Sequence, residues 1–309
     1  MADISLSLLG DIDPRTAVEQ LHAWGGPVWI AESAQGADAL VTAAGLRFAA
    51  PQRTVGFAVL VSALRHPWSV ATACRTLAAW GGDVRLGIGV GDAAWKQQLG
   101  LETTRTVSAL SGEIVRLRQS LDAPGPAWMD GGGRDDRRIP IYVGAEGPRM
   151  TAMAATSADG LILPFLRTDR YLRERVATLK AAAPRSRAVT EVVVGVADTA
   201  EAGAAKLQRW LRYITRAPLY RDVFVDAGLT PGEAERYRDR VAAGDADAAL
   251  PLPIVQSICV LGTPEQCADN IARRYLGWND EIVLVTPGRY LLDLVRVGQA
   301  LIQTPTPRS

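Results

Sequence analysis

Cysteine and histidine are scarce in this chain of 309 residues, and their scarcity removes several classes of function. The three cysteines, Cys74, Cys259 and Cys267, form no CxxC pair, which argues against a disulfide framework and against a structural zinc site. The two histidines, His22 and His66, cannot supply an HExxH metal motif, and any Ser-His-Asp triad must use one of them. We therefore expect no metal site and a reducing, cytoplasmic environment.

The sequence also lacks an excess of one charge and a long hydrophobic run. Lys and Arg total 34 against 33 for Asp and Glu, so no basic field attracts a phosphate backbone, and we expect no nucleic-acid partner. No segment approaches 18 uninterrupted apolar residues, and no basic stretch precedes an apolar one near Met1. We therefore expect neither export nor a membrane anchor.

What the sequence does contain is an alternation of short β-branched runs with helical stretches. Eight runs are mostly apolar on consecutive positions, as in strands that are buried on both faces of a parallel sheet. These runs are Ile4–Leu9, Val28–Ala31, Val55–Val61, Val84–Val90, Ile139–Val143, Gly160–Leu163, Glu191–Val196 and Ile282–Val285. The helical patterns are Arg15–Ala23, Trp68–Trp80, Thr104–Leu121, Pro148–Ser157, Asp169–Ala183, Glu201–Ile214, Pro264–Tyr275 and Leu291–Ile302. Eight strands and eight helices in alternation predict an α/β fold, a (β/α)8 TIM barrel.

Two segments interrupt this alternation. Asp122–Arg138 is rich in proline, glycine and mixed charge, so we expect a solvated loop. Residues from about 215 to 257 hold a helical piece near Glu233–Ala243, followed by Pro251 and Pro253, and we expect an insertion after strand seven that covers the barrel mouth. No Gly/Ser-rich linker divides the chain, which predicts one elaborated domain over residues 1–309.

Two glycine-rich motifs follow predicted strands. Gly144-Ala145-Glu146-Gly147-Pro148-Arg149 comes after strand five and opens a helix, where small residues and free N–H groups suit a phosphate; an ordinary strand–helix turn explains it equally well. Gly87-Ile88-Gly89-Val90-Gly91-Asp92 ends strand four, but the later acidic residue of a dinucleotide-binding motif is missing. A flat ring system pressed against the glycine backbone explains the second motif better.

A few polar residues near strand ends are candidates for catalysis, because barrels display their catalytic groups there. Glu32 and Ser33 end strand two, and Asp92 follows strand four. Glu32 is either a proton donor or a salt-bridged strand end. His66, after strand three, is either catalytic or a hydrogen-bonded loop anchor next to a helix.

Several of these segments together resemble the bacterial luciferase-like superfamily of flavin- and deazaflavin-dependent barrel oxidoreductases. The segments are Gly56-Phe57-Ala58-Val59-Leu60 with Arg65-His66-Pro67, Val84–Gly91, Ile139–Ala145 with Gly147-Pro148-Arg149, Ala158-Asp159-Gly160, and Gly262-Thr263-Pro264-Glu265. The insertion, with Pro218-Leu219-Tyr220-Arg221 and Gly228, is similar to that of members that use coenzyme F420. The match spans nearly the whole chain.

The resemblance implies a flavin-like ring at the carboxyl-terminal mouth of the barrel. It implies a bulge with a non-prolyl cis peptide at Ala58–Val59 under the middle ring, and a phosphate on the backbone of Gly147–Arg149. The predicted cofactor-binding residues are thus Ala58, Val59, Gly89, Gly91, Gly144, Ala145, Glu146, Gly147, Pro148 and Arg149. The predicted catalytic residues are Glu32, Ser33 and Asp92, without a metal ligand.

The function that this resemblance implies is a hydride transfer between coenzyme F420 and a small organic substrate. FMN is the alternative cofactor, in a monooxygenase or a reductase; Arg149, Arg167 and Arg170 either favour the carboxylate-rich deazaflavin tail or are solvated surface charges. Many family members carry a histidine where this chain has Ser33, which disfavours a dehydrogenase that needs a strong base there. A non-catalytic flavin-binding barrel and a flavin-free barrel for a phosphate ligand are further alternatives.

The resemblance also implies a homodimer. In the family, helices two and three form the interface, and the helix Trp68–Trp80 of this chain would lie in it. Tryptophans at helical spacing are otherwise explained by packing in the core.

Overall fold

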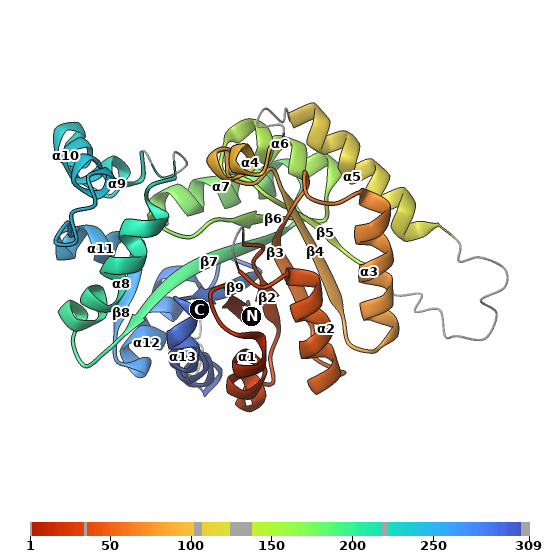
Figure 1. Ribbon diagram of the computed structural model, residues 1–309, viewed down its shortest axis with the longest axis horizontal. Helices are drawn as coiled ribbons and strands as arrows, with labels where there is room; N and C mark the ends of the chain where they lie inside the picture. Colours follow the sequence, from red (N-terminus) through yellow and green to blue (C-terminus); the bar gives the residue numbers. More distant parts are fainter. Residues whose placement is uncertain are drawn as a thin grey trace.

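Parallel strands alternate with helices throughout the computed structural model, which describes residues 2–33, 36–101, 107–123, 138–217, 220 and 222–303 (Figure 1). The strands are β1 (Asp3–Leu8), β2 (Val28–Ile30), β3 (Val55–Val61), β4 (Val84–Gly89), β5 (Ile141–Gly144), β6 (Gly160–Leu163), β7 (Arg187–Val196), β8 (Cys259–Gly262) and β9 (Glu281–Val285). The helices are α1 (Pro14–Gln20), α2 (Ala39–Ala49), α3 (Pro67–Ala79), α4 (Ala93–Gln98), α5 (Val107–Asp122), α6 (Pro148–Ser157), α7 (Asp169–Ala182), α8 (Ala200–Ile214), α9 (Val223–Asp226), α10 (Pro231–Ala242), α11 (Leu252–Ile258), α12 (Pro264–Tyr275) and α13 (Leu291–Gln303).

Eight of the described strands close into a ring, which confirms the predicted TIM barrel. Their order is β1-β2-β3-β4-β5-β6-β7-β9, and β9 pairs back onto β1, with every pair parallel. In this ring β7 lies four strands from β3 in either direction, so the two strands face each other across the barrel. The ninth strand, β8, lies outside the ring and pairs with Val193–Val196 of β7.

The structure corrects the predicted elements at three places. The strand β8 was not expected, because the apolar run from Ile254 to Leu261 is divided between α11 and β8, and hydrophobic periodicity does not separate a short helix from a short strand. The helix α2 was also missed, because its buried face contains small residues such as Ala39 and Ala43. The short helix α4 was not expected either. The insertion of residues 215–257 follows α8, which corresponds to the predicted helix Glu201–Ile214. Most of the predicted loop Asp122–Arg138 lies outside the described residues.

An apolar layer fills the middle of the barrel. Its buried members are Trp29, Ala58, Tyr142, Ile162, Val189 and Val283. The two aromatic rings meet edge to face with their centroids 5.5 Å apart. Gly56 and Gly160 make room for them, because a Cβ atom there would lie 2.5 Å from the Trp29 ring and 2.7 Å from the Tyr142 ring. The layer is therefore a packed floor, not a channel.

At the amino ends of the strands a buried carboxylate joins several strands of the ring. Glu281 of β9 is fully buried and accepts hydrogen bonds from Ser5 Oγ of β1 (2.5 Å), Trp29 Nε1 of β2 (2.6 Å) and Arg85 Nη1 of β4 (2.5 Å). Arg187 Nη2 of β7 lies 3.6 Å from the same carboxylate. A buried charge is tolerated where donors and a counter-charge surround it, as they do here.

The insertion packs on the opposite, carboxyl-terminal side of the barrel. Tyr220, Phe224 and Tyr237 belong to a second apolar cluster that includes Leu166, just after β6, and Val285 at the end of β9. Figure 1 shows α9 and α10 together at one end of the molecule and α3 at the other. In the part of the chain that the structure describes, no helix has the length and apolar character needed to cross a membrane.

The Glu281 network predicts a large stability effect. Glu281→Gln removes the charge that faces Arg85, and the loss should lower the free energy of unfolding by about 3 kcal/mol. This value is at the low end for a broken buried ion pair, because Arg85 still has the Asp3 carboxylate at 3.6 Å. Denaturant titration measures the change. Glu235→Gln, on the exposed face of α10, is the matched control and should shift the free energy of unfolding by less than about 0.5 kcal/mol. Equal effects of the two substitutions would contradict the role of the network.

Candidate active site

The strand β3 carries the predicted bulge at the barrel mouth. The peptide bond between Ala58 and Val59 is cis, as expected. Pairing of β3 with β4 passes from Phe57 opposite Leu86 to Leu60 opposite Ile88, so β3 has one more residue than β4 over this stretch. Val59 packs on the apolar layer inside the barrel and forms part of the floor of the mouth.

Glycines from the two neighbouring strands surround Val59. A Cβ atom on Gly89 would lie 2.6 Å from Val59 Cγ2, and one on Gly144 would lie 2.7 Å from Val59 Cγ1. Gly91 has a φ of +72°, and a Cβ atom on it would lie 2.6 Å from Val61 Cγ1. The structure therefore brings predicted residues of β3, β4 and β5 together in a cradle that side chains at the glycines would fill.

The helix α6 begins at the edge of this cradle with an uncapped N-terminus. Gly147 is its N-cap residue and makes no side-chain hydrogen bond, and a Cβ atom added there would meet nothing within 4 Å. Pro148 and Arg149 in the first turn are exposed, whereas Ala145 is buried. Free amides at a helix N-terminus beside open space suit an anion such as a phosphate.

Glu146, predicted to bind cofactor, is engaged mainly with the protein. One carboxylate oxygen pairs with Arg167, and the Tyr171 hydroxyl donates to the Glu146 carbonyl oxygen at 2.5 Å. Burial raises the pKa of Glu146, and the Arg167 charge opposes that rise. Arg170 also has an acidic partner, Asp226 of α9, at 2.7 Å. Arg167 and Arg170 are thus ion-paired, although the Arg170 side chain is itself exposed, and Arg149 is exposed in the first turn of α6.

The three predicted catalytic residues lie in different surroundings. The Glu32 side chain is 4% exposed. One carboxylate oxygen accepts a hydrogen bond from the Val61 amide at 2.6 Å and the other pairs with Arg65, so Glu32 is a salt-bridged residue at the end of its strand. Asp92 caps α4 by accepting from the Trp95 amide at 2.9 Å. Ser33 is exposed. His66 caps α3 by accepting from the Trp68 amide at 3.2 Å, so it anchors the loop as the second interpretation expected.

Sequence reasoning missed a buried acid, Glu191 of β7. It is 7% exposed, and burial raises its pKa to about 8, although the Phe165 amide donates a hydrogen bond that lowers the pKa. Tyr220 of the insertion lies close enough for the charges of Glu146, Glu191 and Asp92 to raise its pKa, after the larger effect of burial. The signal in the sequence was a single acid at the start of the apolar run Glu191–Val196.

Buried polar atoms without partners occur near the mouth. Among the described residues, Ser7 Oγ at the end of β1, Ser62 Oγ after β3, Glu146 Oε1 after β5 and Trp95 Nε1 in α4 have no hydrogen-bond partner. Other unpaired buried atoms lie elsewhere in the described chain, but buried polar groups normally find partners, so these four are available to a ligand at the mouth. The cradle, the open helix N-terminus and these atoms fit a ligand with a flat ring and a phosphate.

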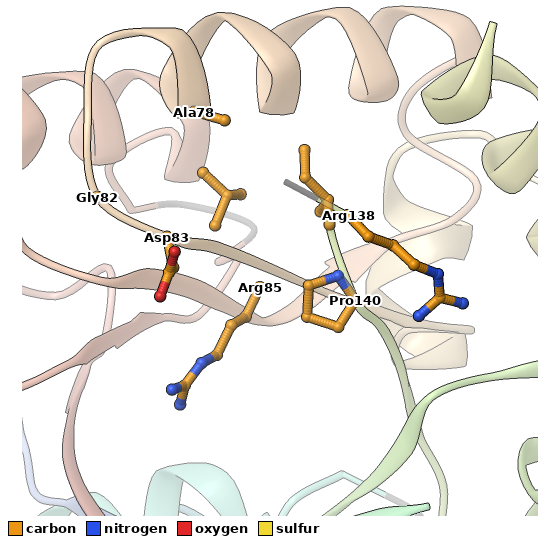
Figure 2. Close-up of a pocket in the computed structure, with 8 residues that line it drawn as sticks. Ala78, Gly82, Asp83, Arg85, Arg138 and Pro140 are labelled. Carbon is orange, nitrogen blue, oxygen red and sulfur yellow. The ribbon is translucent and has the colours of Figure 1, made fainter. Parts of the chain in front are cut away.

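A cavity of about 350 Å³ lies at the other end of the barrel, between the start of β4 and the residues that come just before β5 (Figure 2). Arg85 and Arg138 border it, but in Figure 2 their guanidinium groups point in different directions. Arg85 binds Glu281 and Arg138 binds Asp159, each at 2.5 Å. Because both charges are already paired and lie at the amino ends of the strands, we place the candidate site at the mouth instead.

Comparison with known proteins identifies the family to which the chain is similar. The family model described as luciferase-like monooxygenase matches residues 26–278. A phthiodiolone/phenolphthiodiolone dimycocerosates ketoreductase of Mycobacterium bovis is 24% identical over 278 residues, which cover 76% of this chain and 69% of the relative.

Two solved structures share the fold at low identity. The coenzyme F420 dependent tetrahydromethanopterin reductase from Methanopyrus kandleri has a TM-score of 0.78 at 18% identity, with 97% of this chain and 98% of that chain covered. The oxygenating constituent of 3,6-diketocamphane monooxygenase from Pseudomonas putida, in complex with FMN, has a TM-score of 0.69 at 15% identity, with coverage of 97% and 98%. The fold therefore occurs with either cofactor.

The glycine cradle predicts a specific coupling between two substitutions. Gly144→Ala should lower the free energy of unfolding by about 1–3 kcal/mol, because its methyl group overlaps Val59. In the Val59→Ala background the same substitution should cost clearly less, since the overlapping Cγ atoms are gone. Denaturant unfolding of the four proteins measures the coupling. Gly147→Ala is the control and should be nearly neutral; strictly additive effects of Gly144→Ala and Val59→Ala would rule out the contact.

Proposed function

Because the chain belongs to the luciferase-like monooxygenase family, we propose that it is an oxidoreductase that transfers a hydride between coenzyme F420 and a small organic substrate. The observation that carries the proposal is the cradle of Val59, Gly89 and Gly144, where the two glycines carry no side chains that would obstruct a tricyclic ring. The open N-terminus of α6 beside it suits the phosphate of the same molecule.

Different residues would bind the ring, the phosphate and the tail of this cofactor. Val59 and the glycines would support the ring, and the amides after Gly147 would bind the phosphate. Arg149, exposed in the first turn of α6, is available for the carboxylates of a deazaflavin tail, which an FMN molecule lacks. This is the feature that favours F420 over FMN.

The chemistry of such a site depends mainly on position. Bound deazaflavin supplies or accepts a hydride equivalent, and the protein orients the substrate and excludes water. The relative from Mycobacterium bovis is named a ketoreductase, which supports a carbonyl or alcohol carbon as the reacting group. Phe165 and Tyr220, stacked with centroids 6.0 Å apart, offer an apolar wall for the substrate beside β6.

Titration of cofactors followed by fluorescence tests the proposal. We expect coenzyme F420 to bind more tightly than FMN, and Gly147→Asp to weaken binding at least about tenfold, or about 1.4 kcal/mol, because a carboxylate would repel the phosphate. Gly147→Ala is the matched control and should bind like the unchanged protein, since its methyl group meets open space. Tighter binding of FMN would mean that the cofactor is a flavin and would direct the search for a reaction to oxygen chemistry. If neither F420 nor FMN binds, the proposal is wrong.

We further propose that the protein is a homodimer through α2 and α3. Large apolar side chains on these two helices are exposed: Phe48 is 86% exposed and Trp68 60%, and Val41 and Trp80 are exposed beside them. Exposed apolar side chains of this size on two helices support association with a second protein surface. The face lies away from α9 and α10 (Figure 1), so association there leaves the insertion unobstructed.

Hydrodynamic size tests the dimer. Trp80→Glu places a charge in the proposed interface and should halve the apparent mass in size-exclusion chromatography with light scattering. Tyr213→Glu is the control, since Tyr213 is also an exposed aromatic residue but belongs to α8. A monomeric unchanged protein, or an unchanged size of Trp80→Glu, would exclude this interface.

A further inference from the structure

Glu191 points into the barrel, one step nearer the mouth than the apolar layer. Side chains alternate along a strand, and Val189, two residues before Glu191, belongs to that layer. Its neighbour across the β7–β9 pair is Val283, another member of the layer. The Glu191 carboxyl group therefore lies at the edge of the floor on which Val59 also packs.

The closure of the barrel sets Glu191 opposite Val59. β7 lies four strands from β3 in both directions around the ring, so residues at the mouth ends of these strands face each other. A flat ring that rests on Val59 with one face turns its other face toward β7. A substrate stacked on that open face would lie between the ring and Glu191.

Glu191 keeps a slight exposure although the apolar layer beside it is closed. The residue is 7% exposed, whereas Val189 and Val283 next to it are fully buried, as is Trp29 in the layer below. Glu191 is therefore approached from the mouth and not through the layer. A ligand in the mouth would cover it.

Glu191 has few partners for a buried acid. In the described part of the chain its hydrogen-bond donor is the Phe165 amide, and no ion pair involves it. Glu281, in the same barrel, receives three donors and an arginine charge. A buried carboxyl group without a counter-charge is stable as the neutral acid, and burial indeed raises the pKa of Glu191 to about 8.

We infer that Glu191 is the acid that exchanges a proton with the substrate oxygen at this mouth. This inference rests on the proposed function. In the direction of reduction, the substrate carbonyl carbon gains a hydride from the reduced deazaflavin, and the carbonyl oxygen takes the proton from the Glu191 carboxyl group, which becomes a carboxylate. Water at the mouth returns the proton before the next turnover. Alcohol oxidation uses the same groups in reverse, with the carboxylate as the base.

The surroundings of Glu191 allow this role. Tyr220 of the insertion is the titratable group that interacts with it, and Glu146, Arg167 and Asp92 lie around Tyr220. The residues that face it from β9 and β6, such as Val283 and Ile162, are apolar. A group in this setting is poised to change charge near neutral pH, because neither an arginine nor a lysine holds it ionised.

Infrared spectroscopy of the [13C]glutamate-labelled protein tests the inference without a known substrate. The unchanged protein should show a protonated carboxyl band at pH 7 that disappears with a midpoint near pH 8 and is absent from Glu191→Gln. Addition of coenzyme F420 should raise this midpoint by at least about half a pH unit, because the ligand removes the carboxyl group from water. Glu235→Gln, with its exposed side chain, should leave the band unchanged.

The outcomes separate the inference from the proposed function. Coenzyme F420 that binds without moving the midpoint, or a band that titrates near pH 4.5, would overturn the role of Glu191 and leave the cofactor proposal intact. Absence of F420 binding to the unchanged protein would overturn both. Glu191→Gln should bind F420 within about twofold of the unchanged protein, since it keeps the size and the acceptor for the Phe165 amide. If Glu191→Gln does not fold, Glu191→Asp serves instead, and its band should keep a raised but displaced midpoint.

Discussion

The barrel depends on one buried carboxylate at its base. Glu281 joins β9 to β1, β2 and β4 through hydrogen bonds and lies near the Arg187 charge of β7. Trp29, which donates one of these hydrogen bonds, is also a member of the apolar layer above, where its ring packs against the Tyr142 ring. The base therefore sets the position of the layer, and the layer supports the floor on which Val59 rests. Because polar groups in a barrel interior are costly without partners, loss of one member of this network destabilises the closed ring.

Two glutamates of the barrel interior show how environment decides the use of one residue type. Glu281 is surrounded by donors and an arginine, so its charge is compensated and its contribution is structural. Glu191, nearer the mouth on β7, has the Phe165 amide and apolar neighbours, which favours the neutral acid. Glu32 resembles Glu281 in this respect. It is held by Arg65 and the Val61 amide, which disfavours a role as proton donor. Chemistry at this mouth is thus expected from the acid with the fewest partners.

The insertion completes the mouth from the side of β6 and β7. Its Tyr220 stacks near Phe165, and its α9 is tied to the start of α7 through Asp226, which accepts from Thr168 and pairs with Arg170. The cofactor cradle, by contrast, comes from β3, β4 and β5, elements of the barrel itself. The barrel thus supplies the proposed cofactor surface, whereas the wall facing a substrate comes largely from the insertion and the loop after β6.

Local patterns in the sequence were sufficient for the barrel, the glycines at its mouth and the helix that opens at Gly147, because buried parallel strands and strand–helix turns have signatures within a few residues. They were insufficient for β8, which shares a continuous apolar run with α11, and for α2, whose small buried residues weaken its pattern. The partners of Glu32 and Glu281 and the isolation of Glu191 depend on residues far apart in the chain, brought together when the ring closes. Composition and periodicity carry no information about such distances, so the state of each buried acid is decided by the tertiary contacts around it.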